Sequence, residues 1–286
     1  MNLNPSILAA LGAMLFWGVG DFFIQRSTRK IGSLESLFFV GLVGAIGLFP
    51  FVAGDLNLLF SPANLLLLSF LGVLVFFVSI ANFEAFRLGK LSVVDVILEL
   101  ELPVTVFLGV VLLGEQLSLA QFALISLVFF GIILIASRKG ISLLKRFEKG
   151  AAIALATAFG MGFVNFLTAS ALRQTTPVLA IWVPWVFLTL ISLFFIIKKN
   201  AAGALWKTML RQRKLILAEG IFDTAAWVLF AFALVNSPLS ITTAISEGYP
   251  AVAVLLGVFF NREKLFSRQY LGIILTIAAS FALALL

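Results

Sequence analysis

Long apolar stretches with few polar interruptions dominate the chain. Charge-free runs at 36–54, 56–83, 116–137, 150–172, 174–197 and 224–246 are each long enough to cross a membrane, since a transmembrane helix needs about 20 apolar residues. Other segments of this kind contain only isolated acids. The pattern predicts an all-α integral membrane protein with ten transmembrane helices, at roughly 5–25, 34–53, 62–88, 91–113, 119–137, 150–172, 177–197, 214–236, 239–260 and 268–286.

The connections between these helices are short, apart from two basic segments at 138–149 and 198–214. No basic residue precedes the first helix, no small-residue cleavage site follows it, and further apolar segments come after it. We therefore expect this helix to be a membrane span and not a removable signal peptide.

Composition supports lipid as the solvent, because 62% of the residues are hydrophobic, 12% are charged and 31 are Phe. The chain has no Cys and no His, which excludes disulfides, thiolate nucleophiles, imidazole bases and the usual zinc or copper ligands. We expect no cofactor, no metal site and no enzymatic activity. The net charge of +7 need not indicate nucleic acid, because membrane proteins collect Lys and Arg in their loops.

Lys and Arg fall almost entirely on alternate connections. Those after the expected helices 1, 3, 5, 7 and 9 carry 3, 2, 5, 6 and 3 of them, whereas the opposite face carries only Arg173. By the positive-inside rule, the basic face lies in the cytoplasm. We therefore expect both termini outside, in a plasma or inner cell membrane that the chain crosses many times.

The two halves of the chain form an internal repeat, since a shift of 148 residues aligns them without a gap. The aligned pairs are Gly72/Gly220, Leu91/Leu239, Ser92/Ser240, Glu99/Glu247, Gly109/Gly257, Glu115/Glu263 and Gln121/Gln269. A shift of 142 aligns FWGVG (16–20) with AFGMG (158–162). Each half has an odd number of helices, so the second enters the membrane from the opposite side. We expect two inverted five-helix repeats, 1–137 and 150–286, joined by the basic linker 138–149.

The duplicated pattern GVVLLGEQLSLAQ (109–121) and GVFFNREKLFSRQ (257–269) resembles the drug/metabolite transporter superfamily, in its ten-helix EamA branch. A proline in each preceding helix and the glycine-rich helices 1 and 6 share this resemblance, which covers essentially the whole chain. It implies a ten-helix bundle around a central cavity, working by alternating access and often as an exporter of amino acids or similar metabolites. Many members are drawn with both termini inside, whereas the charges here favour the outside.

Eight of the 13 acidic residues fall within the expected spans, where no Lys or Arg lies comparably deep. They are Asp21, Glu84, Asp95, Glu99, Glu101, Glu219, Asp223 and Glu247. A carboxylate at the bilayer centre costs on the order of 2.5 kcal/mol or more, so it should face a cavity or a partner. Alternatively, Asp21 and Glu84 neutralise nearby bases, and the deeper acids are neutral carboxyls bonded to Ser, Thr or Asn.

Residues four apart nearly stack on a helix, so the acids form ladders with one another and with aromatic residues. We expect substrate or proton binding by Glu99, Glu247, Asp95, Asp223, Glu219, Asp21, Trp17, Trp227 and Tyr249. The aromatic rings could stack on an organic cation. Glu84 and Glu101 are further candidates. On a continuous helix Glu101 lies about 200° from Glu99, so it is expected to point elsewhere.

Pro103 and Pro250 interrupt their helices beside the duplicated acids, and we expect them to kink these helices and shape the cavity. Glu115 and Glu263 begin the fifth and tenth helices. An acid there complements the helix macrodipole, so both are expected to mark the fold rather than the site.

These features favour a secondary transporter of small metabolites, coupled to protons or another cation through its intramembrane carboxylates, and the family resemblance implies that it is an exporter. A cavity with acids and no deep base favours a zwitterionic or cationic substrate, such as an amino acid, an amine or a cationic drug. A permease or channel for an inorganic cation is the alternative, since oxygen ligands suffice for it. The remaining expected partners are the lipid bilayer and, if the protein is a homodimer rather than a monomer, a second copy. Nucleic acid is not expected.

Overall fold

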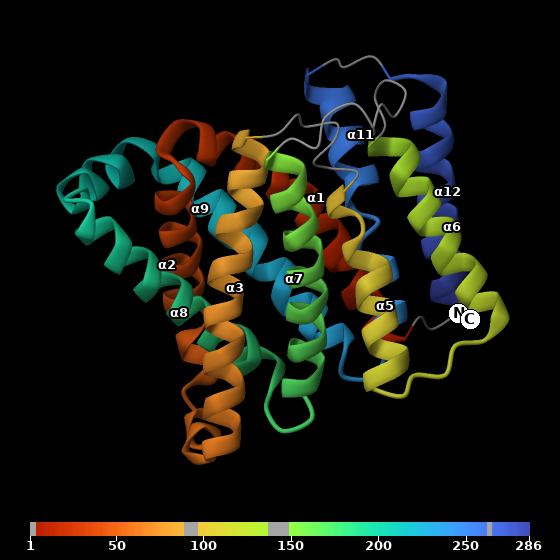
Figure 1. The fold of residues 1–286 in the computed structure, drawn as a ribbon, viewed down its shortest axis with the longest axis horizontal. Coiled ribbons are helices and arrows are strands. Elements are labelled where there is room, and N and C mark those ends of the chain that lie inside the picture. The colour runs from red at the N-terminus through yellow and green to blue at the C-terminus, as the bar shows by residue number, and fades with distance from the viewer. Residues whose placement is uncertain (1–3, 89–96, 137–148, 262–264) are drawn as a thin grey trace.

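The computed structural model describes residues 4–88, 97–136, 149–261 and 265–286. The regular elements in these ranges are helices, which pack side by side into a bundle (Figure 1). They are α1 (Pro5–Ile31), α2 (Ser33–Val52), the short 3-10 helix η1 (Leu56–Phe60), α3 (Pro62–Leu88), α5 (Glu101–Leu112), α6 (Leu119–Ala136), α7 (Lys149–Ala171), α8 (Pro177–Lys198), α9 (Ala202–Ala233), α10 (Leu239–Ser246), α11 (Tyr249–Asn261) and α12 (Ser267–Leu285).

Several helices begin at the signals that the sequence provides. The Asn4 side chain accepts a hydrogen bond of 3.0 Å from the Ser6 amide, and Pro5 then opens α1. The Thr176 hydroxyl accepts from the Leu179 amide at 3.4 Å, and Pro177 opens α8. A polar cap followed by proline satisfies the free amide groups of the first turn. Local chemistry therefore sets where these spans start.

The expected fold class, an all-α membrane protein of about ten helices, is confirmed. Within the described residues, nine helical stretches are long and apolar enough to cross a membrane, and Glu101–Leu112 is a shorter apolar helix. The start of α1 and the end of α12 lie at the same end of the bundle (Figure 1). An even number of crossings places them so.

The expectation that 198–214 is mainly a connection is wrong, because α9 begins at Ala202 and includes most of it. The helix is kinked at Gln212, where φ is −115° and ψ is 19°. Before the kink, Trp206 and Leu210 are exposed among basic residues. This composition is typical of a helix that lies at the membrane interface. Such a helix is not detected when the sequence is searched only for apolar runs long enough to span the membrane.

Two helices that were expected to be continuous, 91–113 and 239–260, are broken. In the second half, α10 ends at Ser246, Glu247 and Gly248 form a turn, and α11 begins at Tyr249. In the first half, a turn at 99–100 separates the helical residues 97–98 from α5. The two turns fall at positions that the 148-residue shift aligns.

Proline accounts for the place of each break. Pro103 and Pro250 lie in the first turns of α5 and α11. A proline ring clashes with the carbonyl four residues earlier, whereas in a first turn it costs no hydrogen bond. The helix therefore stops before the proline and a new one starts. The result is a break, more abrupt than the expected kink.

The helices of the two halves interleave. The repeat relates α1, α2, α3, α5 and α6 to α7, α8, α9, α10–α11 and α12. Helix α1 packs on α9 as α3 packs on α7, and α1 packs on α11 as α5 packs on α7. Helices α2 and α8 pack on each other, as do α6 and α12. Every one of these contacts has a counterpart under exchange of the halves, as expected for inverted repeats.

Glycine permits the closest of these crossings. A Cβ atom on Gly131 of α6 would lie 2.9 Å from the Thr276 amide nitrogen and 3.0 Å from the Gly272 carbonyl oxygen of α12. A Cβ atom on Gly272 would in turn lie 2.6 Å from the Gly131 carbonyl oxygen. The two backbones are therefore in contact, which is the packing that small residues allow in lipid.

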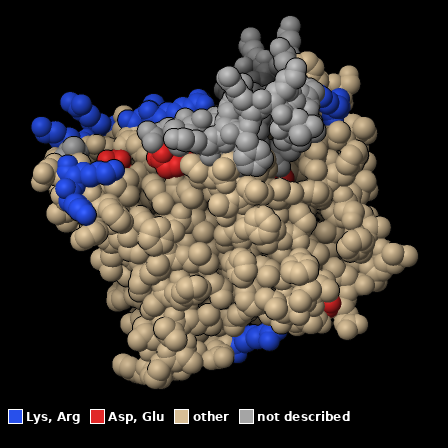
Figure 2. Space-filling view, viewed as in Figure 1, with Lys and Arg blue, Asp and Glu red and all other residues tan. Residues whose placement is uncertain are grey.

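The basic residues mark one end of the bundle. We call this end the basic face and the end with the two termini the terminal face. Figure 2 shows Lys and Arg side chains along one edge and a single patch on the opposite edge. Arg29 and Lys30 end α1 and Lys198 ends α8, whereas Arg173 lies in the opposite connection between α7 and α8.

This asymmetry predicts the orientation in the membrane. A reporter fused after Leu286 should be active outside the cytoplasm, because Lys and Arg are retained on the cytoplasmic side. Paired fusions of alkaline phosphatase and green fluorescent protein measure this, since the first is active only outside and the second fluoresces inside. Fluorescence without phosphatase activity would place Leu286 in the cytoplasm and contradict the predicted orientation.

Candidate functional site

A pocket lies inside the bundle, between helices of both halves. It contains about 1040 Å³ of space not filled by protein atoms, counting the part that opens to solvent. Its walls come from α1, α2, α3, α5, α7, α8, α9 and α11 and from the two helix breaks. The pocket is therefore built from both halves of the chain.

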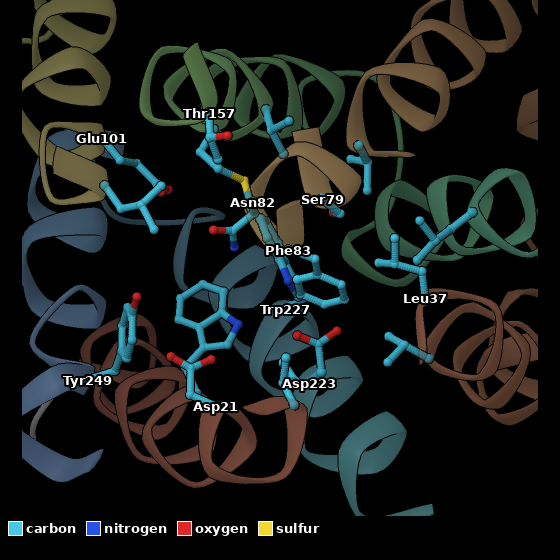
Figure 3. A pocket seen from close by; sticks show the side chains of 18 of the residues that line it. Asp21, Leu37, Ser79, Asn82, Phe83, Glu101, Thr157, Asp223, Trp227 and Tyr249 are labelled. Carbon is cyan, nitrogen blue, oxygen red and sulfur yellow. The ribbon is translucent and has the colours of Figure 1, made fainter. Parts of the chain in front are cut away.

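Five acidic side chains line this pocket. They are Asp21 of α1, Glu99 and Glu247 of the two breaks, Glu101 of α5 and Asp223 of α9. Figure 3 shows Asp21, Glu101 and Asp223 around one space, with Asn82 and Trp227 among them. None of the Lys or Arg side chains in the described part of the chain lines the pocket. The pocket wall is thus strongly acidic.

The helix breaks place the duplicated acids in this wall. Glu99 and Glu247 each retain only 7% of their surface exposed. The amide of Glu247 still donates to the Thr243 carbonyl at 2.8 Å, so Glu247 caps the end of α10. The amide of Leu102 donates to the Glu99 carbonyl at 3.3 Å across the start of α5. Each carboxyl is thereby carried on a turn that immediately precedes a helix, α5 or α11.

The expectation that Glu101 points away from Glu99 is wrong, because both line the pocket. The angle of 200° assumed a continuous helix, whereas the chain turns at 99–100. The Asn165 amide of α7 donates to Glu101 Oε1 at 2.8 Å and to the Thr105 hydroxyl at 3.3 Å. Glu101 is therefore held at the pocket by a neighbouring helix.

Aromatic rings form another part of the wall. The Trp17 and Trp227 centroids are 5.2 Å apart, with their planes at 85°. Tyr249 lies 6.3 Å from Trp17, and Trp185 lies 6.0 Å from Trp227. All four line the pocket. Such rings present π-faces that attract organic cations.

The two tryptophans of α8 have different surroundings. The Trp185 indole N–H donates to the Thr224 hydroxyl at 2.9 Å, which fixes its ring at the pocket. The Trp182 indole N–H donates to the Ala45 carbonyl at 2.8 Å, and Trp182 does not line the pocket. Sequence spacing alone does not show which of these two tryptophans lines the pocket.

Three of the candidate acids are not among the described residues that line the pocket. Asp95 lies outside the described residues, and Glu84 lies on α3 away from the pocket lining. Glu219 is fully buried between α9 and α2, where Ser36 donates a hydrogen bond to its Oε1 atom. Its Oε2 atom has no hydrogen-bond partner among the described residues. Glu219 is thus a buried carboxyl one helical turn from Asp223.

Several polar residues of the site were missed by sequence reasoning. Ser79 and Asn82 of α3 and Thr157 of α7 line the pocket, and Asn165 supports Glu101. Asn is costly in lipid, so Asn82 and Asn165 carried a usable signal. Ser and Thr carried none, because they also satisfy carbonyls within membrane helices.

The arrangement suits a small molecule with positive charge. Carboxylates can accept hydrogen bonds from an ammonium group and can also take up protons, while the rings contact apolar or cationic parts. Among the described residues, no three acidic side chains cluster closely enough to hold a metal ion.

Comparison with known proteins identifies the family to which this chain belongs. The EamA-like transporter family matches the chain twice, over residues 4–137 and 148–285. A search of curated proteins finds no significant match. A solved structure described only as "Crystal structure of protein" has the same fold, with a TM-score of 0.78 and 16% identity over 99% of this chain and 98% of the other. The resemblance seen in the sequence is therefore confirmed: this multi-pass membrane protein is a transporter, not an enzyme, and it belongs to the EamA-like transporter family.

Proposed function

We propose that this transporter exports a small cationic or zwitterionic metabolite, such as an amino acid, an amine or a cationic drug. The observation that carries the proposal is a pocket lined by five acids and by none of the described Lys or Arg side chains. A substrate with an ammonium group gains charge-assisted hydrogen bonds there. An anion would meet uncompensated repulsion. Export as the direction follows the resemblance to amino-acid exporters of the family.

Alternating access is supported by the interleaved halves. Transporters built from inverted repeats place the substrate at the junction of the repeats, next to broken helices. Here the breaks at Glu99–Leu100 and Glu247–Gly248 border the pocket and are related by the repeat. Rocking of one half against the other would expose the same acids to each side in turn.

Proton or cation coupling is supported by the surplus of carboxyls. A monovalent substrate needs fewer negative charges than the five acids that line the pocket, so the others can bind protons or a second cation. Glu219 adds a buried carboxyl with one oxygen unpartnered within the described residues. We propose Glu219 and Asp223 as steps on the proton path.

Chemical labelling of a cavity cysteine tests the charge preference. The chain has no Cys, so a Ser79→Cys variant carries a single thiol at the pocket. We expect this thiol to react faster with the cationic reagent 2-(trimethylammonium)ethyl methanethiosulfonate than with its anionic sulfonatoethyl analogue. This preference should exceed that at the exposed control Ala63→Cys by about tenfold, because a cavity of one charge sign concentrates its counter-ions.

Protection from labelling then identifies ligands. L-Lysine, putrescine or ethidium should slow the reaction of Ser79→Cys, and L-glutamate should not. Equal reagent preference at the two positions, or protection by L-glutamate alone, would contradict a cation-binding cavity.

A further inference from the structure

Glu115 lies in the connection between α5 and α6, at the terminal face (Figure 1). It was expected to complement its own following helix. Instead, its carboxylate accepts hydrogen bonds from the Leu239 amide, from the Ser240 amide at 3.0 Å and from the Ser240 hydroxyl. Leu239 and Ser240 begin α10, in the other half of the chain. The expectation is corrected: Glu115 caps a helix of the opposite repeat.

This cap is the main polar anchor of α10. The residue before the helix, Pro238, provides no side-chain hydrogen bond. The Thr242 and Thr243 hydroxyls have no partner among the described residues, and the Ser246 hydroxyl bonds within the helix. A carboxylate at a helix N-terminus gains both from charged hydrogen bonds and from the helix dipole. Glu115 is therefore well placed to fix a wholly buried helix of eight residues.

Gly109 makes room for the contact. A Cβ atom there would lie 2.6 Å from Glu115 Oε2 and 2.8 Å from the Ser240 hydroxyl oxygen. The Glu115 amide also donates to the Gly109 carbonyl at 3.2 Å, which folds the connection back onto α5. The 148-residue shift aligns Gly109, Glu115 and Ser240 with Gly257, Glu263 and Ser92. Ser92 and Glu263 lie outside the described residues, so for them only the residue types are known to recur.

The contact joins the far ends of two helices whose near ends are at the pocket. Helix α5 begins with Glu101 at the first break and ends near the terminal face. Helix α10 begins at the terminal face and ends at Glu247 in the second break. The two helices pack against each other. A movement of α10 relative to α5 would therefore change how Glu247 is placed relative to Glu101.

We propose that Glu115 is a positioning residue for transport. Its carboxylate clamps the start of α10 to the end of α5 and holds Glu247 at the pocket. Release of the clamp lets α10 move relative to α5 during transport. The inference rests on the proposed function only for the role of Glu247, because the clamp itself can be measured without a substrate.

Accessibility of α10 tests the clamp. Thr243→Cys places a single thiol in the fully buried part of α10, and Ser192→Cys places one in buried α8, which is not among the principal contacts of α10. N-Ethylmaleimide, a neutral reagent, should label Thr243→Cys about tenfold faster when Glu115→Gln is added, since charged hydrogen bonds are lost. Glu115→Ala should give a larger rise and Ser240→Ala a smaller one. Labelling of Ser192→Cys should stay unchanged.

Glu35→Gln is the matched control, because Glu35 is an acid in the first turn of α2, a helix not among the principal contacts of α10. It should leave labelling at Thr243→Cys unchanged. An unchanged rate with both Glu115→Gln and Glu115→Ala would overturn the clamp, and so would an equal rise at both reporters, which indicates general loosening. Absence of cation preference at Ser79→Cys would instead refute the proposed function and leave the clamp result standing.

Discussion

Replacing Glu99 or Glu247 by Gln should abolish counterflow of the transported cation in proteoliposomes, or remove its dependence on pH. Both side chains line the pocket and are 93% buried, since each is only 7% exposed. Gln keeps the size and the hydrogen-bonding capacity but can neither balance a positive charge nor release a proton. A hydrogen bond to a charged group contributes roughly 1.5–3 kcal/mol, so affinity should fall by about 10- to 100-fold.

Counterflow is measured with a radiolabelled ligand chosen from the protection experiment, at two external pH values. Glu35→Gln serves as the control, because Glu35 does not line the pocket and its loss should leave the rate unchanged. Wild-type counterflow with wild-type pH dependence in both pocket variants would remove Glu99 and Glu247 from the binding site.

Gly44→Ala should strongly destabilise the protein, because α2 packs directly on Trp185 at this position. A Cβ atom on Gly44 would overlap the Trp185 indole ring and would lie 2.7 Å from the Thr224 hydroxyl oxygen. Trp185 is 3% exposed and its N–H bonds to Thr224, so a shift of the ring would break this hydrogen bond and disturb buried packing. Overpacking of this kind costs about 1–3 kcal/mol. The pocket wall formed by Trp185 should also be displaced.

Gly47→Ala on the same helix is the matched control, since no atom lies within 4 Å of a Cβ atom there. Alanine favours a helix over glycine by roughly 0.5–1 kcal/mol, so this variant should be as stable as the parent or slightly more so. Thermal unfolding of the two purified variants in detergent measures the difference. Equal melting temperatures would show that α2 and α8 can separate at Gly44 without cost.

Apolar run length and the repeat made much of the fold predictable. In lipid, a lone segment can satisfy its backbone only as a helix, so the apolar runs gave helices and the breaks were the exceptions. The alignment of Glu99 with Glu247 under the 148-residue shift singled out both acids as candidate binding residues. The structure places these two acids in the wall of one pocket. Their role in binding stays a prediction until transport is measured.

Two acids show where sequence reasoning fails. Glu101 was expected to point away from Glu99 because the 200° angle between them was calculated for a continuous helix. The helix is in fact interrupted at 99–100, just before Pro103, so this angle does not apply. Glu115 was assigned to its own helix because sequence distance suggested it, whereas its hydrogen bonds go to Ser240, more than a hundred positions away. In both cases the deciding contact is not local.

The sequence by itself therefore determined the solvent, the class of fold, the duplication and the surplus of buried acids. Each of these depends on composition, on apolar length or on comparison of the chain with itself. Only the tertiary structure decided which acids share a pocket, that Trp185 lines it while Trp182 does not, and that Glu115 caps α10. Those outcomes depend on how helices from the two halves interleave, and on the two turns that redirect the chain. The interleaving and the turns are both determined by close packing between segments that are distant in the sequence. No local sequence pattern specifies that packing.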